Sequence, residues 1–310
     1  MVLRSVVLVC SLFAASLTYA QESATNIAEA PNLAPPTQTS AANASAAKSP
    51  WHLSLGTENY TYELDQRTYG SKAATMSLNF VGGVYDINST WSAELRQHFQ
   101  FASSTDNLGG RDRALHRNNW ETSETMIRAI AKPQWLAFEM GAKSMVFDVR
   151  YYAPNDHVAQ DNKELGRLRS DTFAEWFMGP KFSIAGWISP RVQLNSSSNP
   201  NANKGADAEY YQLKAAPYLN YYINDNIAPY YGYTFVGKSS EAQRGQWTPD
   251  MTNVGAHEAG LNLYYGAFYI NTALISETDL NNGAGSLLTN DSRAFAYDNL
   301  SYNLNIYATF

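Results

Sequence analysis

Charged side chains recur at every second position of several apolar segments, and this spacing is the chemically informative feature of the sequence. In the segment 91–101, Glu94, Arg96 and His98 alternate with apolar residues such as Leu95 and Phe99. Successive residues of an extended strand point to opposite faces, so one face of this segment is apolar and the other is charged. Charged groups on one face can pair with one another or contact polar solutes.

The same alternation assigns charged residues along the whole chain to one inward face. Acidic and basic residues nearly balance in this set, which allows two interpretations. The charges face one another across water in a narrow channel, or they cross-link into an ion-paired plug that closes the interior. The predicted pore-lining residues are Glu94, Arg96, His98, Glu124, Arg128, Glu139, Lys143, Arg169, Asp171, Glu175, Lys181, Arg191, Lys214, Glu258, Glu277 and Arg293.

An enzyme that acts on lipids is a third possibility, and the sequence gives it little support. Such an enzyme needs a Ser–His pair with a polar partner. His98 is the only histidine that we place in mid-strand on the inward face, and no serine pattern marks a nucleophile for it. The run Gly283-Ala-Gly285-Ser286 lacks the Gly-x-Ser-x-Gly spacing. The spacings typical of metal ligands are also missing. We therefore expect no catalytic residue, no metal and no cofactor.

Twelve alternating segments between residues 51 and 310 would position these side chains. The fifth is predicted from Leu136, Phe138, Met140, Ala142 and Val146. Short turn-forming links fall near 86–88, 133, 185–186, 224–226 and 265–266, and long polar links fall around 65–70, 103–119, 151–168, 199–207, 239–253 and 281–291. This alternation of short and long links is typical of an all-β fold, a transmembrane antiparallel up-and-down β-barrel. Ten or fourteen strands remain possible, because the first and seventh segments are weakly defined.

Aromatic residues concentrate beside the short links. Trp51, Trp91, Trp135 and Trp187 all lie there, together with several tyrosines. Tryptophan and tyrosine favour the boundary between lipid and water, so this placement predicts an aromatic girdle at the rim with the short turns.

The last segment of the chain alternates up to its final residue. Tyr302, Leu304, Ile306 and Phe310 share one face, and polar residues such as Asn303 lie between them. This strand resembles the C-terminal assembly signal of Gram-negative outer-membrane β-barrel proteins, in which a final phenylalanine closes an alternating strand. The resemblance is to a broad class and covers this strand directly. It implies the barrel assembly machinery, outer-membrane lipids and lipopolysaccharide as partners.

The beginning of the chain predicts export. Residues 1–20 combine Arg4, an apolar run and a small-residue ending at Ala20, which is the pattern of a secretory signal peptide. The single cysteine, Cys10, lies within it, so the predicted mature chain contains no disulfide. Residues 21–50 are rich in alanine, serine and proline, and we interpret them as a disordered periplasmic tail. Residues 51–310 would form the barrel.

Composition narrows the function further. The formal net charge is −6, and removal of the signal peptide makes it more negative, which argues against nucleic acid as a partner. The mean hydropathy is −0.37, and no apolar run of about 20 residues follows the signal peptide. The strands of a transmembrane barrel do not need a continuous apolar run, because only alternate residues face lipid. We therefore expect a porin-like outer-membrane channel for small hydrophilic solutes or ions. A closed structural or adhesive barrel is the alternative.

Overall fold

Twelve β-strands and one short helix make up the described part of the chain. The computed structural model describes residues 49–61, 75–102, 120–155, 163–195, 209–240, 252–279 and 300–310. The predicted signal peptide, most of the predicted tail and the greater part of the long links lie outside these residues. The elements are β1 (Trp51–Thr61), β2 (Thr75–Asp86), β3 (Trp91–Ala102), β4 (Trp120–Ala131), α3 (Gln134–Glu139), β5 (Ser144–Pro154), β6 (Glu164–Phe177), β7 (Phe182–Asn195), β8 (Glu209–Tyr221), β9 (Ile227–Ser240), β10 (Thr252–Tyr265), β11 (Phe268–Asp279) and β12 (Leu300–Thr309).

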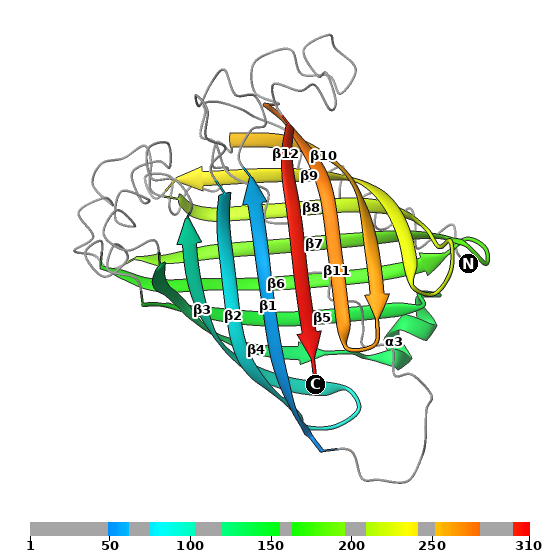
Figure 1. Cartoon of the computed structure of the whole chain (residues 1–310), viewed down its shortest axis with the longest axis horizontal. Helices are drawn as coiled ribbons and strands as arrows, with labels where there is room; N and C mark the ends of the chain where they lie inside the picture. The colour runs from blue at the N-terminus through cyan, green and yellow to red at the C-terminus, as the bar shows by residue number, and fades with distance from the viewer. Residues whose placement is uncertain are drawn as a thin grey trace.

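The strands form one closed barrel. Each strand pairs antiparallel with the next strand in the sequence, and β12 pairs antiparallel with β1 (Figure 1). Closure gives the backbone polar groups partners inside the sheet and leaves no open edge, which is the condition for a β-structure in lipid. The predicted all-β, twelve-stranded, up-and-down barrel is therefore confirmed.

Short connections gather at the end of the barrel where Trp51 and Phe310 lie, which we call the turn rim; the opposite end is the loop rim. The connections at the turn rim are 87–90, 132–143, 178–181, 222–226 and 266–267. The Asn88 side chain accepts backbone N–H groups of the first turn at 2.9 Å, which is a common way for asparagine to stabilise a turn. The predicted short link at 185–186 is wrong. Both residues lie within β7, and the turn instead uses Gly179 and Pro180.

The predicted fifth strand is also wrong in its position. Residues 134–139 form α3, and β5 begins only at Ser144. The apolar residues of this segment fit a helical spacing as well as an alternating one, and Pro133 lies at the helix start, where its missing N–H costs little. The helix packs on outward residues of β5 and β6, and the Trp176 indole donates to the Met140 carbonyl at 3.3 Å. No helix among the described residues is long and apolar enough to cross a membrane.

Alternation along the strands separates an apolar outer face from a polar interior. On β12 the side chains of Asn303, Asn305 and Tyr307 are buried inside the barrel. The predicted assembly-signal residues alternate with them and occupy the outer face. Phe310 continues this face beyond the strand, and its ring lies edge-on to Phe268 with 5.8 Å between the ring centroids.

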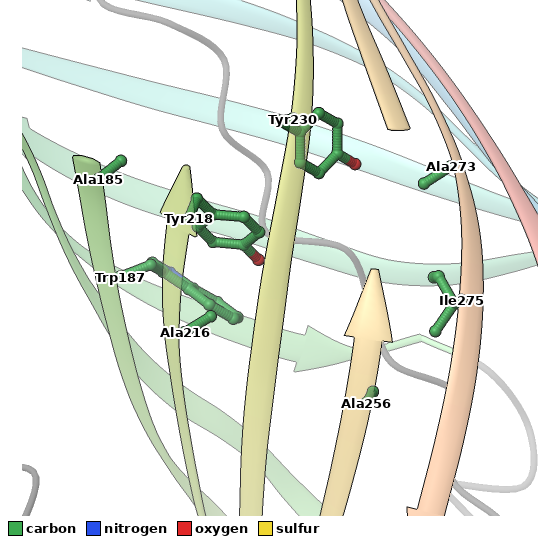
Figure 2. Close-up of a cluster of buried hydrophobic side chains, with 8 residues drawn as sticks. All are labelled: Ala185, Trp187, Ala216, Tyr218, Tyr230, Ala256, Ala273 and Ile275. Atoms are coloured by element: carbon green, nitrogen blue, oxygen red, sulfur yellow. The ribbon is translucent and has the colours of Figure 1, made fainter. Parts of the chain in front are cut away.

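Tryptophans at the turn rim support part of the predicted girdle. Trp51, Trp91 and Trp135 are exposed on the outside of the barrel. Trp187 does not belong to the girdle, because it is 2% exposed and lies inside the barrel beside Tyr218 and Ala216 (Figure 2). The register of β7 explains the error, since the odd-numbered residues of this strand face inward.

Candidate functional site: the inner wall of the barrel

Most of the predicted pore-lining residues lie on the inner wall. Their positions follow from the alternation within each strand, with buried charged residues on the inner face and exposed apolar residues on the outer face. The inward residues of this set are Glu94, Arg96 and His98 on β3, Glu124 and Arg128 on β4, Arg169, Asp171 and Glu175 on β6, Arg191 on β7, Lys214 on β8 and Glu258 on β10.

Five predicted lining residues do not have this position or cannot be placed. Glu139 is exposed on α3, because the strand predicted there does not exist. Lys143 and Lys181 are exposed in connections at the turn rim, where their ammonium groups lie 4.2 Å from the Phe177 ring centroid and 6.0 Å from the Tyr221 ring centroid, respectively. The backbone of Glu277 belongs to β11, but its side chain lies outside the described residues, as does Arg293 entirely.

An ion-paired ladder crosses β3, β4, β5 and β6. Arg96 Nε donates to Glu94 at 2.5 Å, and Arg128 bridges Glu94 at 3.3 Å and Asp148 at 2.5 Å. Arg150 continues the ladder to Asp148 at 2.8 Å and, across to the next strand, to Asp171 at 2.6 Å. Arg169 Nε then donates to Asp171 at 3.0 Å. The ladder therefore joins carboxylates and guanidinium groups along the wall, between residues on the same strand or on adjacent strands.

Burial distinguishes this ladder from an ordinary surface network. The side chains of Glu94, Asp148 and Arg150 are only 1–2% exposed. Removing one charged partner from such a pair is costly because the remaining charge loses its compensation away from water. The ladder therefore ties four neighbouring strands together on one side of the barrel.

The ladder includes two residues that the sequence prediction missed. Asp148 and Arg150 were overlooked because the fifth strand was predicted too early in the chain. The signal was present, since both alternate with the outward residues Phe147, Val149 and Tyr151 in β5. A prediction that placed the fifth strand at residues 144–154 would have assigned Asp148 and Arg150 to the inner face.

Arginines on the inner wall also share one cross-strand row. In the strand register Arg128 lies opposite Arg150, Arg150 opposite Arg169, and Arg169 opposite Arg191. These strands thus place four guanidinium groups side by side, and the carboxylates of Asp148 and Asp171 lie among them. All lysines and arginines in the described strands belong to β3–β9. The strands β10, β11, β12, β1 and β2 contain none.

Carboxylates elsewhere on the wall accept hydrogen bonds from tyrosine hydroxyls. Tyr307 donates to Glu58 at 2.8 Å, and Tyr230 donates to Glu258. At the turn rim Glu175 accepts from Tyr222 at 2.7 Å and from Ser183 at 2.5 Å. Burial and then the Glu175 carboxylate raise the pKa of Tyr222, which lies just beyond β8. The wall thus changes from guanidinium–carboxylate pairs on one side to phenol–carboxylate pairs on the other.

His98, the candidate for a catalytic histidine, lies next to a backbone carbonyl and two aromatic rings. Its Nδ1 lies 3.2 Å from the backbone carbonyl of Glu124, and its ring packs between Phe80 and Tyr152 with centroid separations of 5.7 and 6.1 Å. These contacts hold the imidazole against the wall by its ring and by a backbone carbonyl, and none of them provides the nucleophile of a hydrolase.

Glycines on the inner face make room for large side chains of the adjacent strand. Phe80 lies directly opposite Gly56, Tyr218 opposite Gly232, and Tyr230 opposite Gly260. In each pair the aromatic ring occupies the space that a Cβ on the glycine would fill. The rings therefore lie along the wall, over the neighbouring strand, rather than projecting from it. Tyr218 and Tyr230 are two of these rings, and Figure 2 shows both beside the strands that carry them.

A row of asparagines lies on the side of the wall without basic residues. Asn262, Asn271 and Asn305 are direct cross-strand neighbours on β10, β11 and β12, and Glu58 continues the row on β1. All are buried on the inner face. The sequence prediction missed these amides because it considered only charged residues as lining candidates.

Comparisons with known proteins identify no family. No family model matches the chain, and no curated protein matches it in sequence. Among solved structures, an outer membrane channel from Pseudomonas putida F1 is 11% identical, with a TM-score of 0.49, over 86% of this chain and 97% of that one. The NanC porin is 9% identical, with a TM-score of 0.41, over 82% and 98%. A loop deletion mutant of OmpT, an outer membrane protein of Vibrio cholerae, is 10% identical, with a TM-score of 0.35, over 84% and 98%.

The architecture itself defines the class of protein. A closed antiparallel barrel with a polar inner wall, an apolar outer face and exposed tryptophans at the turn rim is an outer-membrane β-barrel. This agrees with the resemblance that the C-terminal strand indicated.

Proposed function

We propose that this protein is a narrow outer-membrane channel through which small hydrophilic solutes or ions diffuse passively. The proposal rests on the direction of the contacts on the inner wall. The ladder pairs residues of the same or adjacent strands, and the rings of Phe80, Tyr218 and Tyr230 lie over glycines of adjacent strands. Side chains held along the wall leave the axis of the barrel to water and solutes.

Polar groups on the side opposite the ladder also support a channel. Amides and tyrosine hydroxyls occupy inward positions of β10–β12 where aliphatic side chains would suffice to fill a closed interior. Barrels of eight strands are filled by side chains and those of 16–18 strands form wide pores, so a twelve-stranded barrel fits a narrow passage. In this proposal the turn rim faces the periplasm, and residues 1–20 direct export to the outer membrane.

A closed structural or adhesive barrel is the second candidate, and the burial of the ladder favours it. Side chains such as Arg150, at 2% exposure, have almost no contact with solvent. In the channel proposal the ladder is shielded from water and links the strands on one side of the wall. The solute passes along the other side. In the closed barrel the same packing extends across the whole interior.

Single-channel recording distinguishes the two candidates. Protein extracted from outer membranes and purified in detergent is added to a planar lipid bilayer in 1 M KCl, and the current is measured at constant voltage. The channel proposal expects discrete, reproducible conductance steps. Protein that shows heat-modifiable gel mobility, and is therefore folded, yet produces no steps would overturn the proposal and leave the closed barrel.

A further inference from the structure

Four neighbouring strands carry uncharged polar side chains on the outer face of the barrel, where lipid tails are expected. Counted from the turn rim, the first three outward residues of each strand are apolar, aromatic or glycine, and the fourth is polar. These fourth residues are Thr57 on β1, Asn79 on β2, Gln97 on β3 and Thr125 on β4. Thr57 lies directly opposite Asn79, and Gln97 lies opposite Thr125. We call this group of four half-buried residues the polar patch.

The polar patch lies within the depth of the lipid tails. Successive outward residues of a tilted strand are about 5 Å apart along the barrel axis, and the apolar band of such barrels is about 25 Å tall. Thr57 is therefore about 15 Å above Trp51 at the turn rim and about 10 Å below the upper edge of this band. On β7, by contrast, every outward residue from Phe182 to Leu194 is apolar or glycine. The apolar band is thus complete on β7 and interrupted on β1–β4.

Hydrogen bonds hold the polar patch in place without using all its donors and acceptors. Thr125 donates to Gln97 Oε1 at 2.7 Å, and the Thr57 hydroxyl lies 3.2 Å from that of Ser77. Among the described residues, the side-chain hydrogen bonds of Asn79 are all with Ser77. An amide can donate two hydrogen bonds and accept two, so Asn79 can bond a group outside the barrel. Lipid tails contain no such group, and polar atoms that face them are destabilising.

The lack of charge on this face indicates what covers it. None of the described side chains on the outward face of β1–β4 belongs to lysine, arginine, aspartate or glutamate. Lipopolysaccharide carries phosphate groups, which proteins bind through arginine and lysine, and this face provides neither. A second copy of the chain presents the same amides and hydroxyls, which both donate and accept hydrogen bonds. The polar patch is therefore complementary to itself, and two copies meet there without repulsion between like charges.

Small residues between the turn rim and the polar patch allow another barrel to approach closely. They are Gly83 on β2, Ala93 on β3 and Ala129 on β4. A Cβ on Gly83 would meet no atom within 4 Å. Small residues are frequent where membrane-spanning helices pack, because they let two backbones come together, and the same geometry applies to strands. Leu95 and Ile127, which are 56% and 57% exposed, lie beside them and supply apolar contact area.

We infer that the outer face of β1–β4, centred on the polar patch, binds the same face of a second copy, so that the protein is a dimer in the outer membrane. A two-fold axis along the membrane normal places each polar patch opposite its copy. The amides and hydroxyls of the two patches then bond one another away from lipid tails, and β7 faces lipid in each copy. This dimer does not depend on whether the barrel conducts.

Cross-linking through single cysteines tests the dimer in intact outer membranes. The sequence contains one cysteine, Cys10, which lies in the predicted signal peptide, so Gly83→Cys gives the predicted mature chain one thiol beside the polar patch. The matched control is Gly186→Cys, because Gly186 is an outward glycine of β7. Membranes that contain each variant are treated with a flexible bis-maleimide reagent, and the products are separated on denaturing gels.

A second pair of variants tests the polar side chains themselves. Asn79→Leu/Gln97→Leu is added to Gly83→Cys and makes this face suitable for lipid. Ser170→Leu/Thr172→Leu, which replaces two outward hydroxyls of β6, is added to the same cysteine variant as the control. Folding of every variant is checked by heat-modifiable gel mobility.

A product of twice the chain mass is expected from Gly83→Cys and not from Gly186→Cys. The leucine substitutions in the polar patch should reduce its yield at least fivefold, and those on β6 should leave it within twofold. If Gly83→Cys does not fold, Ala93→Cys, at an exposed position of β3, replaces it; if the leucine pair does not fold, Asn79→Ala replaces that pair. Equal yields from the two cysteine positions, or a smaller reduction by a folded patch variant, would show that association does not use this face. A folded Gly83→Cys protein that gives no dimer refutes the inference and leaves lipopolysaccharide as the occupant.

Discussion

Replacing Asp148 by asparagine tests whether the charge ladder is shielded from water and stabilises the wall. The Asp148 carboxylate accepts two N–H groups of Arg128, at 3.0 and 2.5 Å, and two of Arg150, both at 2.8 Å. Asparagine has nearly the same shape, but it is neutral, and its NH2 group replaces one of two oxygens that each accept a hydrogen bond from an arginine. The two arginines, which are cross-strand neighbours, would then face each other without their shared counter-ion.

The expected loss is large because the site is almost completely buried. Two unit charges about 4 Å apart attract each other by about 4 kcal/mol at an effective dielectric constant of about 20, and Asp148 is 2% exposed. Removing one partner from a buried pair typically costs about 3–5 kcal/mol, and we expect Asp148→Asn to lower the free energy of unfolding by this amount. The assay is the urea unfolding midpoint of protein refolded into lipid vesicles, followed by tryptophan fluorescence and gel mobility.

The same substitution at Asp86 is the matched control. Asp86 accepts a hydrogen bond from His52 at 2.9 Å, but its side chain is 50% exposed at the turn rim. Exposed ion pairs contribute about 0–1 kcal/mol, so Asp86→Asn should change the midpoint little. High salt should weaken any effect at Asp86 and leave that at Asp148 nearly unchanged. If Asp148→Asn costs no more than Asp86→Asn, the ladder is solvated, and the assignment of the solute path to the opposite side of the wall is refuted.

One deletion and two substitutions test other parts of the structure. Deletion of Phe310, which closes the outer face of the last strand, should leave unfolded protein in the periplasm; normal heat-modifiable mobility of the deleted chain would contradict its role in assembly. Gly56→Val should displace the Phe80 ring from the wall, at a cost of about 1–3 kcal/mol and with reduced conductance, whereas Gly83→Ala, with no atom within 4 Å of the new Cβ, should change neither. Burial and then the carboxylate that accepts its hydroxyl raise the pKa of Tyr222 above its usual 10.0. The protonated Tyr222 hydroxyl therefore makes its full contribution to the free energy of unfolding below pH 10. This contribution decreases as the pH rises above 10. Tyr222→Phe should flatten this alkaline loss in urea midpoints measured from pH 9 to 12, and an unchanged slope would contradict the assignment.

Alternation along the sequence was sufficient to predict the architecture and most inward residues. It placed Glu94, Arg96 and His98 on one face because charged residues alternate with mostly apolar residues along β3. It failed at α3, where Leu136 and Met140, four residues apart, satisfy both an alternating and a helical spacing, and packing on neighbouring strands decided the outcome.

Other features of the inner wall depend on the register between strands, which the pattern within one strand does not contain. Asp148 bonds to Arg128 because β5 is offset against β4 by a definite number of residues. The row of Asn262, Asn271 and Asn305 likewise exists only after three strands have been aligned.

The seam between β1 and β12 has a consequence for the order of events during assembly. It joins residues at opposite ends of the barrel sequence, and its Tyr307–Glu58 hydrogen bond spans 249 positions. Until β12 has been synthesised and delivered, β1 has an unpaired edge, which readily recruits strands of other chains. Contacts of such long sequence separation form slowly because loop-closure entropy opposes them. A barrel closed in this way must therefore be protected until β12 is in place, and a barrel that lacks β12 exposes two unpaired edges, on β1 and β11, in place of none.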